Sequence, residues 1–73
     1  MPKGYRGPPH FHARATELNY VVQGRLRANG AELTTGDIFV YEPGEVCDVE
    51  ILADTDLIVV KTPSVPADKH LVG

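Results

Sequence analysis

The sequence predicts an all-β protein, a small sandwich or barrel of about six to seven short strands. Short runs rich in β-branched and aromatic residues alternate with turn residues at intervals of roughly eight positions. No stretch repeats apolar residues at helical spacing, so no substantial helix is expected. The chain has 73 residues, which suffices for one domain.

Each expected strand is a run of this kind between turn signals. Leu18, Tyr20 and Val22 alternate with Asn19, Val21 and Gln23, which is typical of a strand with two different faces, and Gly24 is expected to end it. Asn29-Gly30 is a strong signal for a two-residue hairpin turn. The expected strands are 10–13, 18–23, 25–28, 32–34, 38–41, 46–52 and 57–61.

These strands would form a single domain over residues 1–73. Residues 1–9 contain three prolines and two glycines and should be an extended lead-in. Residues 63–73 should be a tail draped over the body of the domain or over a partner. A chain this short buries only about 60% of the surface it exposes when unfolded. We therefore expect a homodimer or strand sharing with a second copy.

Composition and charge exclude several classes of partner. The net charge is −3, and the arginines at 25 and 27 alternate with apolar neighbours, so no basic stripe is available for nucleic acid. No apolar run is long enough to cross a membrane and no signal peptide is recognisable, so we expect no membrane association and a cytoplasmic location. Cys47 is the single cysteine and cannot form an internal disulfide.

Three side chains near the start of the chain are candidate metal ligands. His10 and His12 are two positions apart, so on an extended strand they point to the same face. Glu17 opens the next strand, and a turn between Ala13 and Thr16 would bring it back beside them. Two imidazoles and a carboxylate suit Zn, Fe, Mn, Ni or Co and leave positions open for water or a small molecule. The alternative is a hydrogen-bonded histidine pair without metal.

The spacing of this stretch resembles the first motif of the cupins. That motif reads Gly, five residues, His, one residue, His, three or four residues, Glu, six residues and Gly. All its fixed positions are filled here, by Gly4, His10, His12, Glu17 and Gly24. The resemblance implies a cupin-type jelly-roll β-barrel with a metal site in its mouth, commonly in a dimer.

The second cupin motif is only partly present. Gly36-Asp37 starts it and Gly44 occupies the turn glycine, but the metal-binding histidine position falls on Cys47. Cys47 is either a fourth ligand, which would favour zinc, or a small buried apolar residue on the face shared with Val49 and Ile51. Both interpretations stay open.

Three functions are compatible with these residues. The first is a metal-dependent enzyme acting on a small polar molecule, although no acid or base is identified. The second is a non-catalytic protein that binds or senses a small, sugar-like ligand, which the incomplete second motif favours. The third is an accessory module with a vestigial site. Secondary candidates for the pocket are Asn19 as a lining residue, Arg14 as an anion contact and Glu42 as a base.

Overall fold

The computed structural model describes residues 1–63 and 68–72. Its described residues form seven strands and no helix, which confirms the all-β prediction. The described part of the chain therefore contains no helix that could span a membrane. The strands are β1 (His10–His12), β2 (Thr16–Ala28), β3 (Ala31–Thr34), β4 (Ile38–Tyr41), β5 (Val46–Cys47), β6 (Val49–Thr62) and β7 (Lys69–Leu71).

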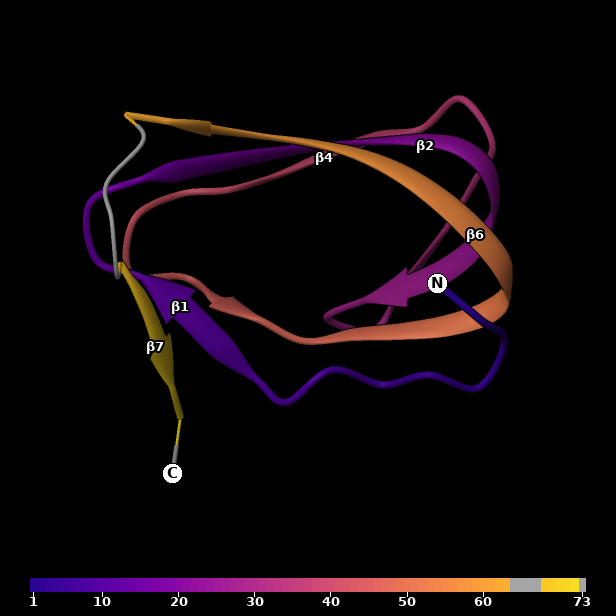
Figure 1. Cartoon of the computed structure of the whole chain (residues 1–73), viewed down its shortest axis with the longest axis horizontal. Helices are drawn as coiled ribbons and strands as arrows, with labels where there is room; N and C mark the ends of the chain where they lie inside the picture. Colours follow the sequence, from indigo (N-terminus) through magenta and orange to yellow (C-terminus); the bar gives the residue numbers. More distant parts are fainter. Residues whose placement is uncertain (64–67, 73) are drawn as a thin grey trace.

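Two sheets make up the barrel. In the larger sheet, β2 pairs with β6 along almost its whole length and with β3 and β4 at its two ends. The smaller sheet has the order β5-β1-β7, and all its pairs are antiparallel. Figure 1 shows the two long strands β2 and β6 bending side by side. Strands β1 and β7 lie across the barrel from them.

Strand β2 joins two segments that the sequence analysis separates at Gly24. Register shifts against β6 lie between Val21 and Leu26, around Gly24. Before them the odd-numbered residues Glu17, Asn19 and Val21 are buried, and after them Leu26 and Ala28 are buried. The irregularity therefore switches the inward face, so one strand can continue round the bend. The prediction that Gly24 ends the strand was wrong.

Two further strand boundaries differ from those expected. The expected strand 46–52 is interrupted at Asp48, and its second part continues through the expected turn at residues 53–56 to form β6. The expected tail contains β7, which pairs with β1. Residues 64–67 and 73 of that tail lie outside the described residues.

The hydrophobic core lies between the two sheets and is small. Leu26, Ile51 and Val21 are its largest fully buried side chains. Ala28, Tyr41 and Cys47 complete the buried cluster, and partly buried side chains of β3, β4 and β6 pack against it. Cys47 therefore lies on the buried face with Ile51, as the alternation predicts, and the polar candidate site adjoins this core.

Candidate metal centre

The side chains of four candidate ligands converge inside the barrel. One nitrogen, oxygen or sulfur atom from each of His10, His12, Glu17 and Cys47 lies within 4.8 Å of the corresponding atoms of the other three. His12, Glu17 and Cys47 are buried and His10 is half-buried. The smaller sheet supplies three of them and β2 supplies Glu17, so the cluster joins the two layers.

The local fold explains why these side chains meet. His10 and His12 lie on the same face of β1, and His10 is directly opposite Cys47 of β5 in the antiparallel register. The turn at residues 13–15 then carries the chain from the smaller sheet to the larger one, where Glu17 is the second residue of β2 and lies on its inward face. The sequence predicts a turn between Ala13 and Thr16, and the structure has a turn at this position.

A buried carboxylate outside the motif holds this turn. Asp68 accepts hydrogen bonds from the backbone N–H groups of Ala13, Arg14 and Ala15 at 3.0–3.1 Å. Burial raises the pKa of Asp68, but the three N–H donors outweigh it and lower the pKa below the ordinary 3.8. Asp68 therefore stabilises the connection between His12 and Glu17 as a carboxylate.

Hydrogen bonds also orient the ligand side chains. Glu17 Oε1 lies 3.0 Å from His12 Nε2, and Glu17 Oε2 accepts a hydrogen bond from Asn19 Nδ2 at 3.1 Å. His10 Nδ1 lies 3.2 Å from the carbonyl oxygen of Pro8. Since that oxygen can only accept, Nδ1 is the donor in this contact, and Nε2 is the ring nitrogen left for a ligand. Asn19 lies at the site, as expected.

Asn29 holds the backbone on both sides of Cys47. Its Nδ2 donates to the carbonyl of Val46 at 2.8 Å, and its Oδ1 accepts from the backbone N–H of Asp48 at 3.0 Å. The same oxygen accepts the hydroxyl of Tyr41 at 2.7 Å. Sequence reasoning identified Asn29 only as a turn residue, because these contacts join positions at least 12 residues apart.

The donor set fits a divalent transition metal. Imidazole nitrogen, carboxylate oxygen and thiolate sulfur are the donor types that such metals take, and the four donor atoms already lie within 4.8 Å of one another. Burial, and then the Glu17 carboxylate, raise the pKa of Cys47 to about 11. Without metal the thiol therefore stays protonated at neutral pH, and a metal that binds sulfur would displace this proton.

The cluster opens into a cavity of about 280 Å³ with a largely apolar wall. Phe39, Val49, Leu57 and Val59 form that wall, and Lys61 lies at the same cavity. Lys61 is opposite Glu17 in the pairing of β2 with β6 and is exposed. It makes no ion pair with any residue in the described part of the chain.

The secondary candidates Arg14 and Glu42 lie elsewhere. Both are exposed, and among the described residues neither lines the cavity. Glu42 Oε2 instead accepts a 3.4 Å hydrogen bond from the hydroxyl of Thr16. The expectation that Arg14 contacts an anion and that Glu42 acts as a base therefore has no support in this geometry. Lys61, which the sequence analysis did not single out, is the cationic side chain that lines the cavity among the described residues.

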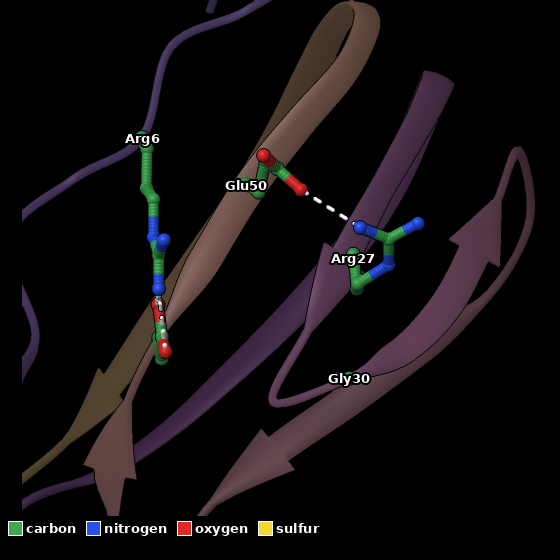
Figure 2. A pocket seen from close by; sticks show the side chains of 5 residues that line it. Arg6, Arg27, Gly30 and Glu50 are labelled. Atoms are coloured by element: carbon green, nitrogen blue, oxygen red, sulfur yellow. Dashed lines mark hydrogen bonds and ion pairs between the residues drawn. The ribbon is translucent and has the colours of Figure 1, made fainter.

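A second hollow, on the surface, is less suited to bind a ligand. Figure 2 shows Arg27 directed at Glu50, with Arg6 reaching down to a second carboxylate. Arg27 lies 2.9 Å from Glu50, and Arg6 lies 3.2 Å from Asp48. Each guanidinium thus already pairs with a carboxylate, and the hollow offers no uncompensated charge.

Comparison with known proteins agrees with this architecture. The family described as Cupin matches residues 2–47, which contain all four candidate ligands. The structure of KdgF from Halomonas sp. is similar with a TM-score of 0.81 and 30% sequence identity. The match covers 89% of this chain and 65% of KdgF, so the chain spans about two thirds of that protein. A search of curated proteins gave no match. The match to the cupin family over residues 2–47 and the structural similarity to KdgF show that this chain belongs to the cupin family.

Proposed function

We propose that this cupin holds a divalent metal ion with His10, His12, Glu17 and Cys47 and uses it to bind a small molecule in the barrel. The observation that carries the proposal is the convergence of four ligand atoms within 4.8 Å at the wall of a cavity. Two imidazoles, a carboxylate and a thiolate favour zinc among the metals considered. Fe, Mn, Ni and Co remain the other metals to test.

The charge of the loaded site suggests the class of ligand. The Glu17 carboxylate and a Cys47 thiolate would together neutralise a divalent ion. Among the side chains that line the cavity, Lys61 then leaves one positive charge, beside walls formed by Phe39 and three aliphatic side chains. We therefore infer a small monoanion with an apolar part, such as a short-chain carboxylate, rather than a fully hydroxylated sugar.

The lining also bears on the choice between a metal-dependent enzyme and a binding protein. Besides the four proposed ligands, Lys61 is the only side chain among the described lining residues that could move a proton. A bound metal would supply Lewis-acid chemistry, but general acid–base catalysis needs a further group within reach. Non-catalytic binding or sensing of the ligand is therefore the second candidate function.

Metal titration tests the metal site directly. Protein freed of metal by a chelator is titrated with Zn²⁺, and bound metal is measured by elemental analysis and calorimetry. We expect one zinc per chain, and at least about 100-fold weaker binding when His12→Ala removes a ligand, since even outer-shell partners change affinity 10–100-fold. No binding of Zn²⁺, Fe²⁺, Mn²⁺, Ni²⁺ or Co²⁺ would refute the proposal.

Calorimetry on the zinc-loaded protein tests the ligand class. Butyrate is compared with butyramide, which has the same shape without the charge. We expect butyrate to bind more tightly, and Lys61→Met to abolish this preference while zinc binding is retained. Lys3→Met removes a charge that does not line the cavity and serves as the control. Equal binding of the two compounds would contradict the monoanion assignment but not the metal site.

A further inference from the structure

The inner face of the larger sheet presents its side chains to the cavity in three successive rows. Three inward side chains of β2 each have a partner on β6 in the antiparallel register, in the pairs Glu17–Lys61, Asn19–Val59 and Val21–Leu57. Paired residues of antiparallel strands point to the same face. Successive rows lie two residues apart, which is roughly 7 Å along a strand. The cavity therefore has a direction, from the row with a proposed metal ligand to the row with Leu57.

The rows change from charged to aliphatic in that direction. The first row holds a carboxylate and an ammonium group. In the second row, Asn19 lies between Phe39 of β4 and Val59 of β6, and its Nδ2 donates back to Glu17 at 3.1 Å. The third row consists of two aliphatic side chains. A ligand with one charged end and one apolar end therefore matches the cavity in one orientation.

The side chains also become less exposed from the first row to the third. Lys61 is exposed and Val59 is 44% exposed, whereas Leu57 is half-buried and its partner Val21 is fully buried. Leu57 packs against the hydrophobic core that contains Val21 and Ile51. Protein cores are densely packed, so this side chain has little freedom to move aside. The charged end of the cavity therefore faces solvent, and Leu57 lies at the closed end.

The side wall and the volume of the cavity limit what can lie between these ends. The Phe39 ring is held edge to face against the buried ring of Tyr41, with ring centroids 5.8 Å apart. The cavity volume of about 280 Å³ corresponds to about nine groups of roughly 30 Å³, the volume of a water molecule. A carboxylate head takes three of these positions, which leaves room for about five or six further carbon atoms.

We infer that Leu57 determines the length of the apolar tail that the ligand can have, an inference that rests on the metal site and the monoanionic ligand proposed above. The charged head lies beside the metal centre and Lys61, and the tail runs past Phe39 and Val59 to end at Leu57. A straight-chain carboxylate of about six or seven carbons fills this space. A longer one overlaps Leu57 or leaves methylene groups in water. Leu57 is thus a specificity-determining residue that makes no contact with the charged head.

Calorimetry on the zinc-loaded protein with straight-chain carboxylates from acetate to decanoate tests the inference. We expect each added methylene group up to hexanoate to tighten binding by about four-fold, the usual effect of burying one such group. Decanoate should bind no more tightly than hexanoate. Leu57→Ala removes three carbon atoms at the closed end and should move the tightest binding to a chain two or three carbons longer. Leu57→Phe should move it to butyrate.

Ile58→Ala is the matched control, because Ile58 is the next residue of β6, is 53% exposed and does not line the cavity. It should leave the preferred length unchanged. A loss of stability alone lowers the affinity for all lengths together and does not move the preferred length. Zinc stoichiometry is measured for every variant, and Leu57→Val, which removes one carbon atom, replaces Leu57→Ala if that variant fails to fold.

The possible failures are distinguishable. Carboxylates that bind equally at all lengths, or a preferred length that is the same in the native chain and in the Leu57 variants, would overturn this inference alone. The same holds if Ile58→Ala shifts the preferred length as Leu57→Ala does. Zinc-loaded protein that binds no carboxylate would overturn the monoanion assignment as well. A chain that binds no metal would overturn the proposed function itself.

Discussion

Cys47 stands where the cupin motif has a histidine, and the structure places its sulfur with the other three donors. If Cys47 is a ligand, Cys47→His should retain tight zinc binding, whereas Cys47→Ser should weaken it by about 100-fold or more. Cobalt-loaded native protein should show a thiolate charge-transfer absorption that both variants lack. Unchanged zinc affinity in Cys47→Ser would instead make Cys47 an apolar core residue.

Asn29 is the side chain through which the hairpin turn acts on the proposed site. Its φ of 48° favours glycine or asparagine, so Asn29→Gly keeps the turn and removes the side-chain hydrogen bonds to Val46, Asp48 and Tyr41. We expect zinc affinity to fall by about 10–100-fold, as for other residues that hold a metal ligand in place without touching the metal. The cobalt spectrum should also shift, which a loss of stability alone would not cause.

The matched variant Asn29→Asp keeps the oxygen that accepts from Tyr41 and Asp48. It should therefore retain more of the native affinity and spectrum than Asn29→Gly. If both variants lower the zinc affinity equally, the loss is due to the hydrogen bond that the amide group of Asn29 donates to the carbonyl of Val46. If neither changes the cobalt spectrum, Asn29 does not position Cys47.

Among the strands, β2 depends on the glycine at which it changes its inward face. Gly24 has φ of 119°, and a Cβ there would lie 2.5 Å from the carbonyl oxygen of Asp54. Gly24→Ala should lower the free energy of unfolding by about 3 kcal/mol through backbone strain and overlap with β6. Gly36→Ala has a similar φ of 91° but open space, so it should cost only about 1 kcal/mol. Urea denaturation measures both, and equal costs would mean that the close approach to β6 is unimportant.

The connection between β1 and β2 should respond to acid through Asp68. The pKa of this carboxyl is lowered on folding, so its stabilising effect is present above the unfolded value of 3.8 and is lost as the pH falls through the lower folded value. Asp68→Asn should lower the melting temperature at pH 7 and flatten the acid side of the stability curve. Asp56→Asn changes an exposed carboxylate on the same strand as Asp54 and is a better control than Asp54, which accepts a hydrogen bond from the backbone N–H of Lys3 at 2.8 Å. A parallel shift of the whole curve would contradict this role of ionised Asp68.

Local patterns predicted the strands better than their connections. The alternation around Leu18 and around Cys47 gives the correct faces because each side chain's direction depends only on its own strand. Gly24 was misread as a strand end because pairing with β6 carries β2 past it. The contacts of Asp68 and Asn29 were missed because they join positions 53–55 and 12–19 residues apart. No local signal in the sequence marks either contact.

For the whole molecule, the cupin fold was predictable because its first motif is intact, whereas the surface of the larger sheet depends on the register between strands far apart in the sequence. The strand pattern placed Leu18, Tyr20 and Val22 on one face, but only the register with β4 and β6 shows that four more apolar side chains extend it. The exposed apolar side chains of this sheet therefore follow from the pairing of its strands, which no single run of the sequence contains.

If the expected dimer packs through the exposed apolar side chains Leu18, Tyr20, Ile38, Val40, Ile58 and Val60 of β2, β4 and β6, the thermal stability of the chain should depend on its concentration. A dimer whose unfolding releases two chains gains about 1.4 kcal/mol for each tenfold rise in protein concentration at 25 °C. We therefore expect the melting temperature of metal-free native protein, followed by circular dichroism from about 1 to 100 μM, to rise steadily. Leu71→Glu should show the same slope. Ile58→Glu should melt lower and at a temperature independent of concentration, because its unfolding involves one chain. A concentration-independent melting temperature in the native chain would separate folding from assembly and leave its 36–58% exposed apolar side chains without a stabilising role.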